Sequence, residues 1–155
     1  MKTALILYAS MSGNTEDMAR LIGQQLSEKG MDVIFEELDL CMTDELFKYD
    51  VILAGSYTWG DGDLPYEAED FYEELGDLNL RGKLAACFGS GDHAYPKFCA
   101  AADLLQRRFK ETGAEVFGDT LKIEGSPESD LEQEACRMFA DAVAEWSAAA
   151  GKSIT

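Results

Sequence analysis

The chain has 155 residues, 46% of them hydrophobic, and its 30 acidic against 13 basic residues give a formal net charge of −17. This length and apolar content predict one folded domain and exclude a disordered chain. The negative charge repels nucleic acid phosphates and anionic lipids, so we expect neither nucleic acid nor a membrane as a partner. The charge would attract a basic protein surface. The alternative is that it only keeps the protein soluble.

The cysteines and the N-terminus indicate a protein of the cytoplasm. The apolar run in MKTALILYAS is about six residues long, shorter than the ~7–15 residues of a signal-peptide core. No stretch approaches the ~20 apolar residues of a membrane span, so we expect a soluble, unexported protein. Cys41, Cys87, Cys99 and Cys136 form no C-x-x-C pair, and with one histidine they give no zinc-like spacing. We expect buried free thiols, a reducing compartment and no metal.

The first third of the chain alternates strand and helix patterns. The apolar run at residues 3–9 is typical of a strand buried on both faces of a parallel sheet. Helical spacing of apolar residues over 15–29 predicts a helix that Gly30 ends. An amphipathic strand at 31–38 and a second fully apolar strand at 51–56 follow.

The middle of the chain repeats this alternation. Apolar residues at helical spacing over 64–75 predict a second helix, and the apolar run at 83–90 predicts another buried strand. A third helical pattern covers 98–109 and ends near Gly113.

The C-terminal part begins with a last strand inside 114–125, which we expect to be broken around Gly118-Asp119. Ser126-Pro127 is typical of a helix cap followed by proline at the first helical position. Residues 151–155 are expected to fray as a C-terminal tail. The helix between them is expected to bury one face, made by Leu131, Ala135, Met138, Phe139, Ala142 and Trp146.

Five strands alternating with about four helices predict a doubly wound α/β domain with a mostly parallel sheet, spanning residues 1–150. Polar or glycine-rich loops at 10–15, 57–63 and 90–97 follow the three most apolar strands. They therefore share the carboxyl edge of the sheet, where open α/β folds bind their ligands.

The first loop, SMSGNT at 10–15, has five hydroxyl, amide or glycine positions in six and no charge. Unpaired N–H groups and a partial positive charge at a helix N-terminus can bind a phosphate, and the loop side chains add donors. The alternative is an ordinary helix cap. The loop lacks both the G-x-x-x-x-G-K-[ST] and the G-x-G-x-x-G pattern, which excludes a triphosphate loop and a dinucleotide fingerprint.

The other two loops bring aromatic side chains to this edge. Trp59 precedes the glycine-rich stretch 60–63, and Tyr95 follows Ser-Gly-Asp at 90–92. Each has a plainer interpretation, a packing lid for Trp59 and a turn before a helix starting at Pro96. Together with the first loop they predict a site for a flat aromatic ring with a phosphate tail.

With these three motifs in order, essentially the whole chain resembles the flavodoxin family. The last strand shows no large inserted loop, which is typical of its short-chain type. The resemblance implies a flavodoxin-like three-layer α/β/α domain, a five-stranded parallel sheet in the order 2-1-3-4-5, and FMN as the cofactor. This strand order and the position of FMN at its switch point are the family's known ones.

The resemblance also implies roles for individual residues. Trp59 would cover the inner face of the flavin ring and Tyr95 the outer face. Gly60 would present a peptide that can flip at flavin N5, with the N–H of Asp61 near O4. His93 is expected to be a solvent-facing loop residue, with an influence on the flavin as the alternative. The full set of implied FMN-binding residues is Ser10, Met11, Ser12, Gly13, Asn14, Thr15, Ser56, Tyr57, Thr58, Trp59, Gly60, Asp61, Ser90, Gly91, Asp92, Tyr95, Lys97, Phe98 and Cys99.

The implied function is that of a low-potential one-electron carrier, not an enzyme, which uses the semiquinone/hydroquinone couple of FMN. The implied partners are basic-surfaced redox proteins, namely flavodoxin or ferredoxin reductase-type donors and acceptor enzymes, met by a monomer. Residues 61–77 contain eight acidic and no basic residues. Several carboxylates at ~10 Å would lower the potential of the reduced couple by something near 100 mV.

Three other functions remain as alternatives. An FMN-dependent NAD(P)H quinone or azo reductase of the same fold would need a second pocket over the ring, where Tyr95 is expected. A phospho-receiver domain would need acidic residues where the first and third strands end, but Ser10 and Ser56 stand there. A flavin-free binding module of this fold would be colourless.

Overall fold

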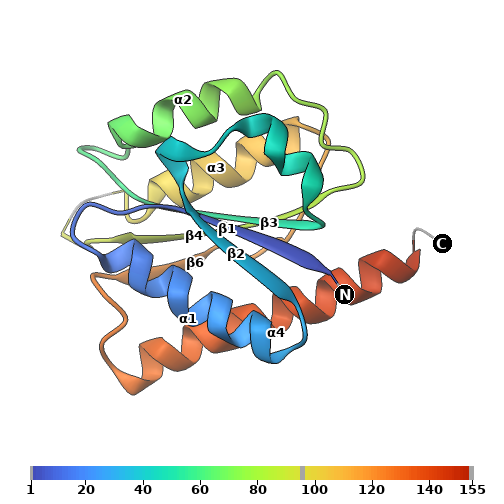
Figure 1. Ribbon diagram of the computed structural model, residues 1–155. Coiled ribbons are helices and arrows are strands. Elements are labelled where there is room, and N and C mark those ends of the chain that lie inside the picture. Colours follow the sequence, from blue (N-terminus) through green and yellow to red (C-terminus); the bar gives the residue numbers. More distant parts are fainter. Residues whose placement is uncertain (1, 95–96, 154–155) are drawn as a thin grey trace.

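The computed structural model describes residues 2–94 and 97–153, in which a parallel sheet lies between two layers of helices (Figure 1). The strands are β1 (Thr3–Ala9), β2 (Asp32–Glu37), β3 (Val51–Tyr57), β4 (Leu84–Gly91), β5 (Glu115–Val116) and β6 (Leu121–Glu124). The helices are α1 (Asn14–Glu28), α2 (Tyr66–Leu75), α3 (Ala100–Glu111) and α4 (Asp130–Ser153), with 3-10 turns η1 (Leu38–Leu40) and η2 (Thr43–Lys48).

The strand order is β2-β1-β3-β4-β5, with β6 also paired to β4, and all pairs are parallel. This confirms the predicted α/β/α fold and strand order, with six strands where five were expected. The extra strand arises because the last strand is broken, as the sequence predicts. β5 pairs with the start of β4 at Leu84 and Ala85, and β6 pairs with its end from Phe88 onward.

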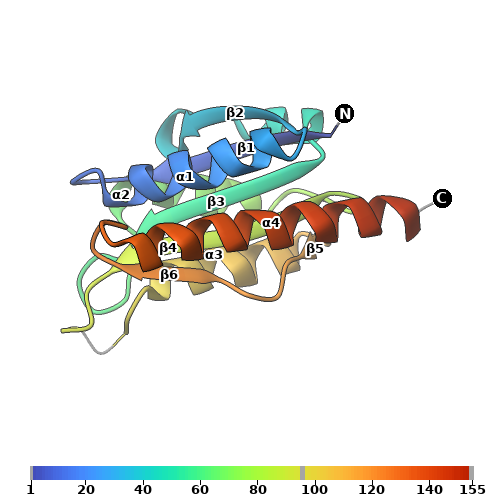
Figure 2. The same cartoon turned by 90° about the horizontal axis from the view of Figure 1, so that it is seen from below.

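The central strands are buried on both faces, as their continuous apolar runs predict. Alternate residues serve opposite layers: Ile6 packs with α1 and α4 on one face, and Leu5 with α2 and α3 on the other. Figure 2 shows α1 and α4 side by side along one face of the sheet. At the edge, β2 leaves Ile34 and Phe35 partly exposed.

The close packing of β4 leads to a prediction at Gly89. A Cβ there would lie 2.8 Å from the backbone oxygen of Ser56 and 2.9 Å from the Cβ of Ala102. Gly89→Ala is therefore expected to lower the free energy of unfolding by roughly 1–3 kcal/mol, measured by urea denaturation. Gly118→Ala is the matched control, because a Cβ at Gly118 meets nothing within 4 Å. Equal urea midpoints for the two variants would contradict the prediction.

The predicted start of the last helix is wrong by three residues. α4 begins at Asp130, where the N–H of Glu132 donates to Ser129 Oγ (3.1 Å) and the N–H of Ser129 donates to Glu132 Oε1 (3.2 Å). This reciprocal pair is a capping box, which outweighs the proline signal at Ser126-Pro127. The Ser126 hydroxyl instead donates to Asp17 Oδ2 (2.8 Å), joining this loop to α1.

The predicted buried face of α4 is also partly wrong. Leu131 and Met138 are 82% and 61% exposed. Of the other predicted residues, Phe139 is buried, and Ala135, Ala142 and Trp146 are half-buried. The observed inward face is formed by Cys136, Phe139, Ala140, Val143, Ser147 and Ala150.

Several smaller expectations can also be compared with the structure. Leu64 and Phe98 precede the helices in which they were expected, because α2 and α3 begin two residues later. Residues 151–153, expected in a frayed tail, continue α4. All four cysteines are buried and free. Within the described residues, no helix is long and apolar enough to cross a membrane, and no group of three potential metal ligands occurs.

Candidate functional site

A cleft of about 190 Å³ opens where β1, β3 and β4 end. It joins the three loops that the sequence singles out. Every lining residue belongs to the set implied by the resemblance: Ser10, Met11, Ser12, Asn14, Thr15, Tyr57, Thr58, Gly60, Ser90, Gly91, Asp92, Lys97 and Cys99. Lys97 is the one cation and Asp92 the one carboxylate in this lining.

Five further predicted residues do not line the cleft, although each is next to a lining residue in the sequence: Gly13, Ser56, Trp59, Asp61 and Phe98. Ser56 is fully buried at the end of β3, and its hydroxyl donates to the carbonyl of Tyr57 (2.7 Å). Tyr95, the predicted outer cover of the ring, and Pro96 lie outside the described residues. The ring-covering role of Tyr95 therefore stays a prediction.

The first loop presents unpaired backbone donors at the N-terminus of α1. Gly13 precedes the helix with φ 92°, and the N–H of Asp17 donates to its carbonyl. The N–H of Glu16 donates to Ser10 Oγ (3.3 Å), so the helix-cap interpretation accounts for one donor. The described residues provide no acceptor for the N–H groups of residues 11–15. Five donors beside a helix dipole can bind an anion.

The second loop is a tight turn held by its own backbone. The N–H groups of Trp59 and Asp63 each donate to the carbonyl of the other residue at 2.8 Å. Between them Gly60 and Gly62 have φ of 55° and 110°. A Cβ at Gly62 would lie 2.6 Å from Cδ of Lys97, so glycine is needed there for the second and third loops to meet. Trp59 is 56% exposed and faces a separate hollow beside Leu64.

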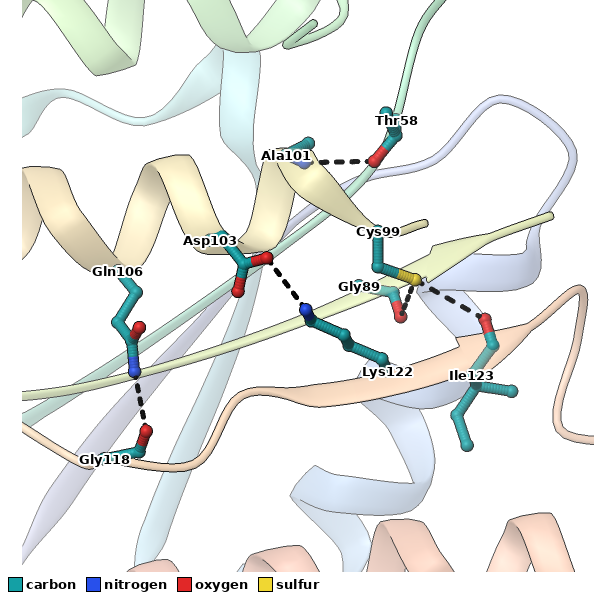
Figure 3. A network of polar contacts seen from close by, with 9 residues as sticks. All are labelled: Thr58, Gly89, Cys99, Ala101, Asp103, Gln106, Gly118, Lys122 and Ile123. Carbon is teal, nitrogen blue, oxygen red and sulfur yellow. Dashed lines mark hydrogen bonds and ion pairs between the residues drawn. The ribbon is translucent and has the colours of Figure 1, made fainter. Parts of the chain in front are cut away.

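Contacts that the sequence did not predict hold His93 in the third loop and the start of α3. The N–H of Ala101 donates to Thr58 Oγ1 (3.0 Å), which ties the start of α3 to the second loop (Figure 3). His93 is exposed, as predicted, yet its ring stacks on Phe98 with centroids 3.7 Å apart. The backbone N–H of His93 donates to Glu124 Oε2 (2.8 Å). No signal in the sequence pairs these residues.

Cys99 combines burial with an unusual backbone conformation. Its φ of 54° is left-handed, which costs a residue with a side chain roughly 1–2 kcal/mol. The Sγ atom lies 3.6 Å from the carbonyl oxygen of Gly89 and 3.9 Å from that of Ile123 (Figure 3). Burial raises the pKa of this thiol to about 12, so it stays protonated and serves the packing of the loop.

A hydrogen bond connects the cleft to the acidic helix α2. The Tyr57 hydroxyl donates to Glu67 Oε1 (2.7 Å). Burial, followed by this hydrogen bond to a carboxylate, raises the pKa of Tyr57 to about 12. Tyr57 therefore remains a neutral donor throughout the physiological pH range.

Comparisons with known proteins agree with this geometry. The flavodoxin family model matches residues 6–139. The chain belongs to the flavodoxin family. A probable flavodoxin 1 of Bacillus subtilis is 52% identical over 147 residues, covering 95% of this chain and 93% of the relative. A flavodoxin of Maridesulfovibrio salexigens is 37% identical over 134 residues, covering 84% of this chain and 91% of the relative.

Solved flavodoxins share the whole architecture. Oxidised flavodoxin 2 from Bacillus cereus superimposes with a TM-score of 0.91 at 49% identity, covering 92% of this chain and 98% of the other. A short-chain flavodoxin associated with a bacterial microcompartment superimposes with a TM-score of 0.90 at 30% identity, covering 95% of this chain and 99% of the other. Flavodoxins are electron-transfer proteins that bind FMN, and the likeness to short-chain members confirms the family and type expected from the sequence.

The residues present fit FMN. The five unpaired N–H groups of the first loop suit a phosphate held by neutral donors. The one cation in the cleft lining, Lys97, belongs to the third loop and not to the first. The remaining walls come from the second and third loops, where glycine backbones permit close approach of a flat ring.

Proposed function

We propose that this flavodoxin binds one FMN in the cleft and carries single electrons at low potential. The observation that supports the proposal most is the run of unpaired N–H groups at one end of a cleft whose other walls are the two predicted ring loops. Bound FMN supplies the redox chemistry. The chain binds the cofactor, orients it and sets the charge around it.

The proposed contacts to the ring come from two loops. Tyr95 is the outer cover, and Trp59 becomes the inner cover once its side chain turns from the hollow beside Leu64 toward the cleft. The ring meets backbone groups of Gly60, Asp61, Asp92, Lys97 and Cys99. We also propose that residues 1–150 act as one domain, in a monomer of the cytoplasm. A monomer suits a carrier that presents the same edge to successive partners.

Titration of flavins into the flavin-free protein tests this proposal. FMN is expected to bind at one equivalent with quenching of its fluorescence, and riboflavin is expected to bind more weakly because it makes no contact with the first loop. Absence of FMN binding would refute the proposal. Equal affinity for the two flavins would refute the phosphate site.

A groove of about 470 Å³ beside the cleft supports docking of basic partners. It lies between η1, η2 and α2, and contains three largely exposed apolar side chains, Leu40, Met42 and Tyr66. Five carboxylates and no basic side chain line it. The carboxylates belong to Asp39, Asp44, Glu67, Asp70 and Glu74. Exposed apolar side chains together with carboxylates suit a basic surface that presents an apolar side chain.

Neutralising three of these carboxylates is expected to slow docking. The variant Asp39→Asn, Asp44→Asn, Glu74→Gln should reduce the association rate with a basic flavodoxin reductase up to about tenfold at low salt. The measurement is stopped-flow electron transfer at several salt concentrations. The difference between variant and wild type should vanish at high salt. Unchanged rates at low salt would contradict docking at this groove.

A further inference from the structure

Two buried hydroxyl groups meet at the boundary of the first and third loops. Thr15 Oγ1 and Ser90 Oγ lie 2.8 Å apart, and the two residues are 0% and 2% exposed. Thr15 belongs to the first turn of α1, and Ser90 pairs with Tyr57 and Ile123 in the sheet. Both residues line the cleft. This contact joins the proposed phosphate end of the cleft to the end of β4.

One of the two hydroxyl protons of Thr15 and Ser90 is not needed for the hydrogen bond between them. Two hydroxyl groups carry two protons, and the bond between them needs only one. Neither side chain has another hydrogen-bond partner among the described residues. A buried donor without an acceptor is costly, so the second proton calls for an acceptor in the cleft that both residues line.

We infer that Ser90 is a positioning residue for phosphate recognition, which rests on the proposed binding of FMN in this cleft. The Ser90 hydroxyl donates to Thr15 Oγ1, which leaves the Thr15 proton for the phosphate. Thr15 stands among the unpaired N–H groups of the first loop, where an anion is most favourable. A hydroxyl that accepts one hydrogen bond donates a stronger second one, so Ser90 strengthens the contact from Thr15.

The opposite proton order would work against the anion. If Thr15 donated to Ser90, the oxygen of Thr15 would present only lone pairs to a phosphate. The surplus proton would then belong to Ser90. In that arrangement Ser90 would contact the phosphate directly, and the two orders predict different energetic coupling between the residues.

A double-mutant cycle in the affinity for FMN and riboflavin separates these possibilities. Ser90→Ala is expected to weaken FMN binding about tenfold, the size typical for one weakened charge-assisted hydrogen bond, and to change riboflavin binding less than about twofold. Thr15→Val removes the donor itself. In the Thr15→Val background, Ser90→Ala should cost no further FMN affinity, because nothing remains to be positioned.

Three results would overturn the inference. An equal loss of FMN and riboflavin affinity in Ser90→Ala would show a structural role. An undiminished effect of Ser90→Ala in the Thr15→Val background would show direct contact from Ser90. Ser90→Cys fills the side-chain space but donates weakly, so FMN affinity at the wild-type level in this variant would show that volume matters and not the proton. Failure of the wild-type protein to prefer FMN over riboflavin would instead refute the phosphate site itself.

Discussion

Replacing Ser12 by aspartate is expected to weaken FMN binding at least about 100-fold while leaving riboflavin binding nearly unchanged. Ser12 lines the cleft in the first loop and is exposed, so the fold tolerates a longer side chain. Two unit charges ~5 Å apart at an effective dielectric constant of ~20 interact by roughly 3 kcal/mol, and a phosphate dianion carries up to two charges. About 3 kcal/mol corresponds to a factor of roughly 100 in the dissociation constant.

The control for this experiment is Ser12→Asn, which has a similar size and no charge. FMN affinity should fall far less in that variant, and thermal unfolding without flavin should be similar in both. An equal loss of FMN affinity in the two variants would show that shape and not charge decides binding. An equal loss of FMN and riboflavin affinity in Ser12→Asp would place the phosphate elsewhere.

Removing acidic residues near the ring loop is expected to raise the potential of the reduced flavin couple. Asp61, Asp63, Glu69 and Asp70 are exposed and make no side-chain hydrogen bond within the described residues. Each carboxylate ~10 Å from the ring opposes an added electron by about 0.4 kcal/mol at the dielectric constant of water, or roughly 18 mV. Conversion of all four to amides should therefore raise the potential by roughly 70 mV at low salt, as an additive limit.

The matched control changes four acidic residues at the opposite end of the molecule, Glu28, Asp32, Asp77 and Glu115, to amides. All four are exposed. Net charge changes equally in both variants, so a difference in potential isolates the effect of distance. Potentials from spectroelectrochemistry should differ by most of the predicted shift, and added salt should shrink it. Equal potentials would show that the charge around the ring loop does not tune this flavodoxin.

The sequence predicts the central sheet and the cleft well because both depend on local patterns. Continuous apolar runs identify β1, β3 and β4, and parallel strands necessarily bring the loops after them to one edge. Polar and glycine residues in those loops then mark the cleft. All residues that line the cleft except Cys99 lie in these three loops, and the full set, Cys99 included, is the one implied by the resemblance to flavodoxins.

Pattern reasoning fails where two signals compete or where partners are distant in sequence. Ser126-Pro127 and the capping box at Ser129 both indicate a helix start, and only the packed structure selects the second. The contact between Thr15 and Ser90 spans 75 positions, and neither residue type specifies the other. Such side-chain pairs follow from the register of the sheet and the placement of the helices, which single residues do not encode.

The most direct test of one-electron transfer is the visible spectrum of the FMN-loaded protein during anaerobic stepwise reduction. The yellow oxidised form is expected to pass through a blue form, in which the flavin has gained one electron and a proton, before it bleaches. Distinct steps are expected because the protein, and not the cofactor alone, decides which redox states are stable. Direct bleaching in a single two-electron step, with no blue form at any stage, would contradict the assignment as a one-electron carrier.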